Sequence, residues 1–479
     1  MDMWYEEGVI YQIYPLGMCG APERNYDLGQ AGTDWDRSRD GQAGNGADGQ
    51  NVAGGQAGIE TEAAAWQQQE RDKHRILRVL DWIPHIKELG ATCVMFNPVF
   101  ESDAHGYDTR DYNLIDCRLG TNEDFKQVCQ AIHDAGMKVM LDGVFNHTGR
   151  GFMGFRDVQK NRWDSQYKDW FNISFDGNTN YNDGFWYEAW EGCNELVKLN
   201  TGNPQVREYL ADAIRGWVRD YDIDGLRLDV AYLLSGDFLH FLRDLANNIK
   251  PDFALVGETL HGDYNTWMND GACHGVTNYE CYKGLYSSFN CANMHEIAYS
   301  LNRQFGGENW CLYNGKHLLS FLDNHDVSRI GTILTDKNHL KPAYGLLFGM
   351  PGVPCVYYGS EWGIEGDKSK GDKDLRPDIA TPVENELTQW ISSLAKARKE
   401  SRALVYGSYK NLLVMPKQLI FERSCDGERV IVAINADSST FHAGFDARAG
   451  RGVDLITGEE HDFGGGSDLQ PYSCSYWKV

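Results

Sequence analysis

The 479-residue sequence has no run of 18 apolar residues, and its start lacks the basic segment and smooth apolar core of a signal peptide. We therefore expect neither a membrane span nor secretion. Basic residues are also scarce, because 45 Lys and Arg face 69 Asp and Glu, for a net charge of −24. This balance repels phosphate backbones and anionic lipids, so it predicts no nucleic acid partner and no membrane partner, and it favours a neutral ligand.

The twelve cysteines contain no C-x-x-C pair and no zinc-ligand spacing. In a chain of this length, scattered cysteines are typical of reduced, mostly buried thiols. We therefore expect a cytoplasmic protein without a disulfide framework.

Eight short apolar runs alternate with amphipathic stretches over most of the chain. The runs cover residues 9–14, 91–96, 137–142, 224–230, 253–258, 274–279, 317–322 and 353–358. Near-continuous apolar character is typical of parallel strands that are covered on both faces. The intervening stretches carry helix signals, such as a capping box at 121–136 and Asn-Pro at the start of 203–222. This repeat predicts a (β/α)₈ TIM barrel. An open doubly wound sheet is the alternative, but no Gly-rich phosphate loop follows the first run.

The predicted barrel spans residues 1–147 and 200–397. Residues 148–199, rich in aromatics, Gly and Asn, are interpreted as a small subdomain inserted after the third strand. Residues 398–479 are expected to form a C-terminal all-β domain, a β-sandwich, in which "QLIFERS" and "ERVIVAINA" make a hairpin. The connection 20–72 contains a Gly-rich tract, residues 40–58, whose composition cannot build a core and predicts a mobile segment.

Charged residues fall at the ends of the predicted strands. Arg227 and Asp229 alternate with apolar residues in "DIDGLRLDVAY" and so share one face of a strand. Asp142, Glu258 and "DNHD" (323–326) end three other strands. Each cluster alone is explained by structural or surface charge. Their coincidence favours an active site, because the carboxyl ends of barrel strands meet at one rim.

Two close carboxyl groups suit the cleavage of a glycosidic bond. One attacks the anomeric carbon while the other donates a proton to the leaving oxygen. The attacking carboxylate must stay ionised, and a neighbouring guanidinium achieves this by lowering its pKa. We therefore expect Arg227 to hold Asp229 charged, although a purely structural ion pair would have the same sequence.

Seven motifs occur in an order that resembles the α-amylase superfamily of glycoside hydrolases over nearly the whole chain. They are "GVIYQIYP" (8–15), "DGVFNH" (142–147), "LVKLN" (196–200), "GLRLDVAY" (225–232), "VGETLH" (256–261), "FLDNHD" (321–326) and "GVPCVYYGSE" (352–361). The segment from 195 to 231 is most similar to the branch of cyclomaltodextrinases, neopullulanases and maltogenic amylases. The resemblance implies retaining hydrolysis of α-glucosidic bonds in maltodextrins or cyclodextrins.

The resemblance also implies roles. Asp229 matches the nucleophile, Glu258 the acid/base and Asp326 the carboxylate that stabilises the transition state. Arg227 matches the nucleophile's partner, and Asp142 a structural acid. The remaining sugar-binding matches are His147, His325, the aromatic platform Tyr107 and, beside it, His105. In the charged loop after the eighth strand, Arg376 and Asp374 are candidates to bind the sugar at subsite −2, as similar residues do in relatives. The alternative is that this loop is only a solvated lid.

The sequence departs from the branch at several points. The branch usually has an N-terminal β domain before the barrel, whereas the first barrel strand here begins by residue 9, and the oligomeric state is left open. Tyr232 and Leu260 replace the branch's Asn and aromatic residue near the cleft, so we expect different acceptor specificity. No cofactor is expected. A structural calcium ion is left open, with Asn146 as its candidate ligand, while Asn25, Asp27 and Asp34 are interpreted as solvated loop residues.

Other functions remain compatible with these motifs. A 4-α-glucanotransferase or a trehalose-synthase-like isomerase would use the same carboxylates, because water and a sugar hydroxyl compete for one intermediate. A non-catalytic sugar-binding relative is disfavoured, since all three acids are present. A metal-dependent barrel hydrolase is disfavoured as well, because no His-x-His pair follows the first strand.

Overall fold

The computed structural model describes residues 3–26 and 55–479, and its centre is an eight-stranded parallel barrel. Neighbouring strands follow the order β13-β12-β11-β5-β2-β1-β15-β14, and a parallel bridge between Thr277 and Leu319 closes the sheet. The strands are β1 (Ile10–Ile13), β2 (Cys93–Phe96), β5 (Lys138–Gly143), β11 (Gly225–Leu228), β12 (Ala254–Gly257), β13 (Gly275–Val276), β14 (Leu319–Phe321) and β15 (Val353–Tyr357). Seven of them lie within a predicted run, and β5 extends one residue beyond its run, to Gly143. The (β/α)₈ prediction is confirmed, and the open sheet is excluded.

The two faces of the barrel strands bury different side chains. Met140, Ala254 and Val256 belong to a core inside the barrel, whereas Leu226 and Leu228 pack in the larger core between strands and helices. Because side chains alternate along a strand, Arg227 must point to the interior. This placement explains the charged residues within the apolar run of β11.

Helices cover the outside of the barrel. They are α4 (Arg78–Glu88), α5 (Asn122–Asp134), α7 (Pro204–Tyr221), α8 (Gly236–Ile249), α9 (Tyr279–Asn290), α10 (Met294–Phe305), α12 (Leu340–Gly349) and α14 (Glu386–Lys399). The predicted capping signals are present, since Thr121 and Asp124 exchange hydrogen bonds at the start of α5 and the Asn203 side chain caps α7. Among the described residues, no helix has the length and apolar character needed to cross a bilayer.

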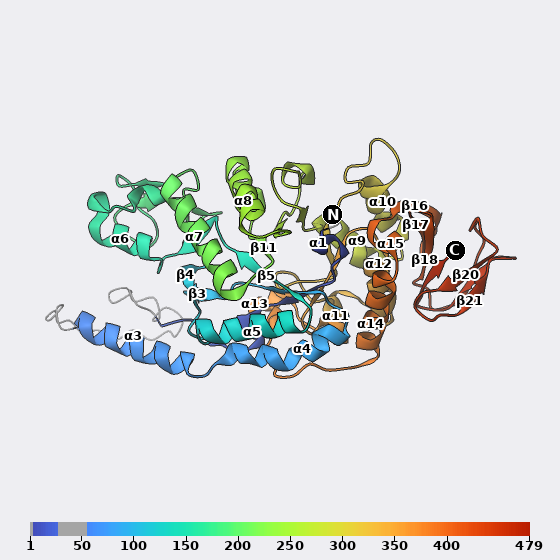
Figure 1. Ribbon diagram of the computed structural model, residues 1–479, viewed down its shortest axis with the longest axis horizontal. Helices are drawn as coiled ribbons and strands as arrows, with labels where there is room; N and C mark the ends of the chain where they lie inside the picture. Colours follow the sequence, from blue (N-terminus) through green and yellow to red (C-terminus); the bar gives the residue numbers. More distant parts are fainter. Residues whose placement is uncertain (1–2, 27–54) are drawn as a thin grey trace.

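Two segments extend from the barrel at opposite ends of the long axis (Figure 1). After β5 come β6 (His147–Gly149), α6 (Met153–Asn161), β7 (Ile173–Ser174), β8 (Trp186–Tyr187), β9 (Ala189–Trp190) and β10 (Cys193–Lys198). Strands β6, β10 and β9 form a small antiparallel sheet beside the carboxyl end of β5. This segment, which apart from His147 falls in the predicted insertion 148–199, therefore lies next to the rim where the acids were expected.

The opposite end carries the C-terminal all-β unit. A six-stranded antiparallel sheet has the order β16-β17-β18-β23-β20-β21, and its inner face packs on the pair β19–β22 through a small apolar core. The predicted hairpin is present, with Asp426 and Gly427 both at positive φ in its two-residue turn. The strands are β16 (Ser408–Val414), β17 (Gln418–Cys425), β18 (Glu428–Asn435), β19 (Phe441–Ala443), β20 (Arg451–Asp454), β21 (Glu460–Asp462), β22 (Ser467–Leu469) and β23 (Ser473–Lys478).

The long connection after β1 differs in part from the prediction. Its last third forms a helix, α3 (Gly55–Arg71), so residues 55–58 at the end of the Gly-rich tract belong to a helix that was not predicted. The run "IETEAAAWQQQER" consists largely of strong helix formers, and this local preference outweighs the glycines that precede it. Residues 40–54 of the Gly-rich tract, with Asp27 and Asp34, lie outside the described residues.

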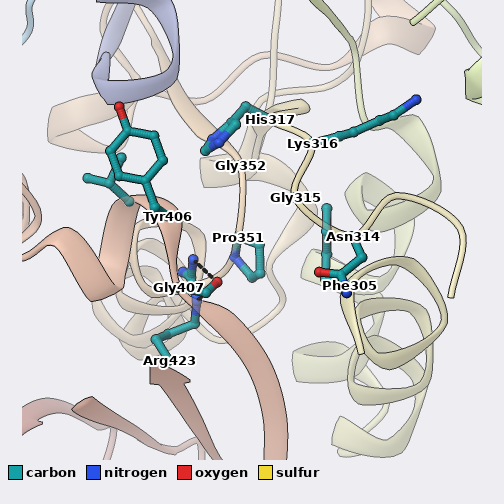
Figure 2. Close-up of a pocket in the computed structure, with 11 residues that line it drawn as sticks. Phe305, Asn314, Gly315, Lys316, His317, Pro351, Gly352, Tyr406, Gly407 and Arg423 are labelled. Carbon is teal, nitrogen blue, oxygen red and sulfur yellow. Dashed lines mark hydrogen bonds between the residues drawn. The ribbon is translucent and has the colours of Figure 1, made fainter. Parts of the chain in front are cut away.

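Two buried arginines join the barrel to the C-terminal unit. Arg423 on β17 donates to the carbonyl groups of Gly349, Leu404 and Gly407, and Arg398 on α14 donates to those of Gly352 and Leu404. Figure 2 shows the guanidinium of Arg423 beside Gly407, at one wall of a cavity of about 30 Å³. The cavity lies next to the amino ends of β14 and β15, at the opposite end of the barrel from the acids.

We predict that Arg423→Lys lowers the free energy of unfolding by about 2–4 kcal/mol, because an ammonium group cannot reproduce the fork of donors and leaves buried carbonyls unpaired. Urea denaturation measures the change. Arg451→Lys is the matched control, since the side chain of Arg451 is 72% exposed. Equal stability of Arg423→Lys and the control would contradict a structural role for the buried guanidinium.

Candidate active site

A cleft of about 470 Å³ opens at the carboxyl ends of the barrel strands. Its wall includes Asp229, Glu258 and Asp326, which follow β11, β12 and β14 respectively. Chemistry in TIM barrels takes place at this end. The three acids named from the sequence therefore share one cavity.

Arg227 connects the acids of the site. Its Nη1 donates to Asp142 Oδ1 at 2.7 Å and to Asp229 Oδ1 at 2.9 Å, and its Nη2 contacts Glu258 Oε1 at 2.6 Å. Strand register produces this arrangement, because Arg227 on β11 lies opposite Asp142 on β5 and Val256 on β12. The Arg227 side chain is 4% exposed, so three carboxyl groups share one buried positive charge.

The acids of this group do not ionise independently. Burial raises the pKa of Asp229 well above its usual value, Arg227 acts in the opposite direction, and Glu258 and Asp142 raise it again. Burial likewise raises the pKa of Glu258, with Arg227 opposing and Asp326 adding to the rise. Arg227 does act to lower the pKa of Asp229 as expected, but the net pKa is raised, because burial and the other acids outweigh the guanidinium. One cation beside two such acids favours a pair that holds a single proton.

Asp326 has different surroundings. Its Oδ2 lies 2.9 Å from His325 Nε2, and its Oδ1 accepts from Arg376 Nη2 at 2.9 Å. Although burial raises the pKa of Asp326, these two neighbours outweigh it and hold the pKa well below its usual value. Asp326 is therefore ionised when the Asp229–Glu258 pair still holds its proton.

Tyr107 forms part of the floor of the cleft. Its hydroxyl group donates to Asp142 Oδ2 at 2.9 Å and lies 2.5 Å from His325 Nε2, and the Tyr107 and His325 rings are stacked. Asn97 Nδ2 donates to both Tyr107 and Asp142. This network fixes an aromatic ring beside the acids.

His147 contributes a neutral ring to the site. Its Nε2 lies 3.9 Å from Asp229 Oδ2, and burial, assisted by the charge of His105, lowers the pKa of His147 to about 3. Among the described residues, Nε2 has no hydrogen-bond partner. A neutral imidazole with a free ring nitrogen suits hydrogen bonding to an uncharged ligand.

The backbone after Asp229 is strained. Val230 has φ 41° and ψ 45°, a left-handed conformation that is rare for a β-branched residue. Its amide donates to Glu258 Oε2 at 2.9 Å. The strained residue thus fixes the second oxygen of Glu258, while Arg227 holds the first.

The structure brings most of the sequence-predicted residues together. His105, Arg376, Tyr232 and Leu260 also line the cleft, but Asp374 does not appear in its wall and instead accepts from the Asp367 amide. Seven further residues that line the cleft were not predicted from the sequence: Trp190, Cys193, Glu195, Leu196, Tyr279, Lys368 and Asp372. Asp372 was recognisable, because it lies four residues before Arg376 at the spacing of a helical ion pair.

The calcium prediction finds no supporting geometry in the described residues. Asn146 is buried, its side-chain Nδ2 donates to His147 Nδ1, and its backbone carbonyl accepts a hydrogen bond from the Leu199 amide. A calcium ion takes six to eight oxygen ligands. These contacts give no support for a calcium site at Asn146. The interpretation of Asn25 as solvated is wrong, because its side chain is buried and donates to Glu101.

Glu101, with Asp116 and Cys117, forms the one described group of at least three His, Cys, Asp or Glu ligand atoms close enough to hold a metal ion. Arg118 bonds Asp116, while Asn25 and the Cys117 amide bond Glu101. These contacts give the group a structural explanation.

Known proteins resemble this chain. The family described as "Alpha amylase, catalytic domain" matches residues 76–398. A cyclomaltodextrinase from Bacillus sp is 32% identical over 373 residues, 75% of this chain and 65% of the relative. Neopullulanase 2 from Thermoactinomyces vulgaris is 30% identical, and the alignment covers 95% of this chain and 74% of the neopullulanase. The chain spans 65%, 63% and 66% of three similar curated relatives, all cyclomaltodextrinases.

A solved structure covers the whole chain. The cyclic alpha-maltosyl-(1→6)-maltose hydrolase from Arthrobacter globiformis superimposes with a TM-score of 0.75 at 26% identity, and 100% of each chain is covered.

We predict that the free energy of unfolding falls as the pH drops from 7 to 5, partly because of His147. Its folded pKa of about 3 lies below the unfolded value of about 6.5. Between these values the unfolded chain binds a proton that the folded chain rejects, so stability is full above pH 6.5 and is lost toward pH 3. For this one group the loss from pH 7 to 5 is about 2 kcal/mol.

Urea denaturation of wild type and His147→Gln at both pH values measures this contribution. The variant should lose less stability than wild type, whereas His295→Gln, at an exposed position on α10, should behave as wild type. The same pH dependence in all three proteins would show that His147 is not held neutral.

Proposed function

The chain belongs to the α-amylase family of glycoside hydrolases, and from that premise we propose that it is a retaining α-glucan hydrolase. The substrates are maltodextrins or cyclodextrins, cleaved at α-1,4 bonds. We further propose that the enzyme also cleaves α-1,6 bonds. The observation that carries the proposal is the single guanidinium shared by Asp229 and Glu258 at the wall of a 470 Å³ cleft. Names such as cyclomaltodextrinase and neopullulanase among the relatives support the substrate class.

In this mechanism Asp229 is the nucleophile and Glu258 is the acid/base. The carboxylate of Asp229 attacks the anomeric carbon as Glu258 gives its proton to the glycosidic oxygen, so the leaving sugar departs as a neutral alcohol. Water then attacks the glycosyl–enzyme ester, and Glu258 takes back a proton from it. The pKa values of Glu258 and Asp229 are both raised, and in this mechanism the single proton of the pair lies on Glu258, which leaves Asp229 ionised for the attack.

The other residues bind the sugar and balance charge. Asp326, kept ionised by Arg376 and His325, accepts hydrogen bonds from sugar hydroxyls and stabilises the positive charge of the transition state. Tyr107 supplies the apolar platform, and His147 and His105 bind hydroxyl groups. Asp142 orients Arg227 and Tyr107. No cofactor takes part in this scheme.

The twelve free thiols support a cytoplasmic location, since all of them lie in the described part of the chain without a disulfide.

Glu258→Gln should lower turnover by about 10²–10⁴-fold, because the amide cannot supply a proton. Chromatographic product analysis is carried out on maltotriose, β-cyclodextrin and panose in parallel. Wild type should release glucose and maltose, and Glu308→Gln, an exposed position outside the cleft, should match it.

Other outcomes of this experiment would revise the proposal. Longer oligosaccharides without matching new reducing ends would favour a 4-α-glucanotransferase, and trehalose formed when maltose is added as a further substrate would favour the isomerase. Unchanged turnover in Glu258→Gln would refute the assignment of the acid. No turnover of any substrate by folded wild type would refute the substrate class.

A further inference from the structure

The charged loop after β15 brings a lysine into the wall of the cleft. Lys368 belongs to this loop, residues 360–377, for which a solvated lid was the alternative interpretation of the sequence. Its side chain lines the cleft at 48% exposure, together with Asp372 and Arg376 of the same loop. The loop is therefore part of the binding site, and Lys368 contributes a positive charge at its mouth.

A chain of ion pairs connects Lys368 to the reacting centre. Arg376 Nη2 lies 2.9 Å from Asp326 Oδ1 and 3.3 Å from Asp372 Oδ2. The ammonium group of Lys368 pairs with the other oxygen of Asp372. Side-chain exposure rises along this chain from 8% at Arg376 to 48% at Lys368. The chain thus leads from the reacting centre outward, and Lys368 is its last member.

The order of the barrel strands shows which part of the substrate this loop meets. Strand β15 is four strands away from β11 in either direction around the closed sheet, so the two strands lie on opposite sides of the barrel. Strand β12, the neighbour of β11, is followed by Glu258, and the acid that protonates the leaving oxygen must lie on the side of the leaving sugar. The loop after β15 therefore lies on the donor side of the cleft, which binds the sugars transferred to Asp229.

Contacts on both flanks hold this loop across the rim. The amide of Lys368 donates to Ser328 Oγ at 2.9 Å, and Ser328 lies in the connection after β14. On the other flank, the side chain of Lys373 pairs with Glu23, in the connection after β1. The loop therefore spans the rim between its two neighbours, and a glucan that extends from Asp229 in this direction meets it.

We propose that Lys368 is a specificity-determining residue that ends the donor side of the cleft after two sugars. The first sugar binds beside Asp229 and Asp326, and the second lies along Arg376. The ammonium group of Lys368, held by Asp372, occupies the place that a third sugar would take. The inference rests on the proposed function and deepens it.

This wall selects among substrates by their ends. A linear chain with a free non-reducing end fits its last two sugars between the reacting centre and Lys368, so the enzyme transfers a two-sugar unit in preference to a longer one. A cyclic glucan has no end and must bend its third sugar away from Lys368. Linear chains are therefore better substrates than rings.

Lys368→Ala should open the donor side. The substrate is 4-nitrophenyl α-maltohexaoside, whose nitrophenyl group marks the reducing end, and chromatography separates the first products. Wild type should release mainly unlabelled maltose. In Lys368→Ala the ratio of unlabelled maltotriose to unlabelled maltose should rise about tenfold, a size that one steric contact can discriminate. The ratio of kcat/KM for β-cyclodextrin to kcat/KM for the linear substrate should rise as well.

Two further variants are the controls. Lys368→Arg keeps a long cation that can pair with Asp372, and it should retain the wild-type product ratio. Lys370→Ala removes an exposed lysine of the same loop that lies outside the described cleft wall, and it should also match wild type. All variants should share the thermal unfolding midpoint of wild type, because both lysines are exposed.

The product ratio decides the role of Lys368. An unchanged ratio in Lys368→Ala would overturn the proposal, and so would an equal rise in Lys368→Arg or Lys370→Ala. A lower ratio in Lys368→Ala would overturn it too, because Lys368 would then bind a third sugar and not exclude it. Absence of turnover of the linear and the cyclic substrate by folded wild type would instead refute the proposed function.

Discussion

The buried guanidinium of Arg227 is the interaction on which the site depends. It contacts Asp142, Asp229 and Glu258 at once, at 4% exposure. Three carboxyl groups in such a confined rim repel one another, and burial opposes the charge on each. Removing the cation would leave these acids without compensation, which is among the most destabilising changes in a buried network. Strand register supplies the contact, because Arg227 lies opposite Asp142 within the barrel sheet.

The acids differ in how many positively charged neighbours each one has, and this difference separates their roles. Asp229 and Glu258 share Arg227, and their pKa values are raised. Asp326 has Arg376 and His325 beside it, and its pKa is lowered. An acid that holds a proton and a carboxylate that is always ionised thus lie in one cleft. The strained backbone of Val230, whose amide holds Glu258, shows that the fold accepts local cost to fix this geometry.

Much of this architecture could be predicted from the sequence. Apolar runs located all eight barrel strands, and the charged residues at their ends located the three acids, since period two and the barrel rim leave few alternatives. Helix α3 was not predicted, because the Gly-rich residues that precede it and form its first turn are poor helix formers. The position of Trp190 in the cleft wall could not be predicted, because it depends on a hairpin that brings an inserted segment back to His147. The net pKa shift of Asp229 needed the burial and the neighbours of the folded rim.

In the proposed mechanism, Arg227 organises Asp229 as the nucleophile and Glu258 as its acid partner. Trapping the covalent intermediate tests this most directly. In 5-fluoro-α-glucosyl fluoride, the ring fluorine slows both steps by destabilising positive charge, while the good leaving group keeps the first step accessible. Mass spectrometry of peptic fragments should then find one fluoroglucosyl group on Asp229. A label on Glu258 or Asp326, or turnover of the reagent without any labelled carboxylate, would contradict the account.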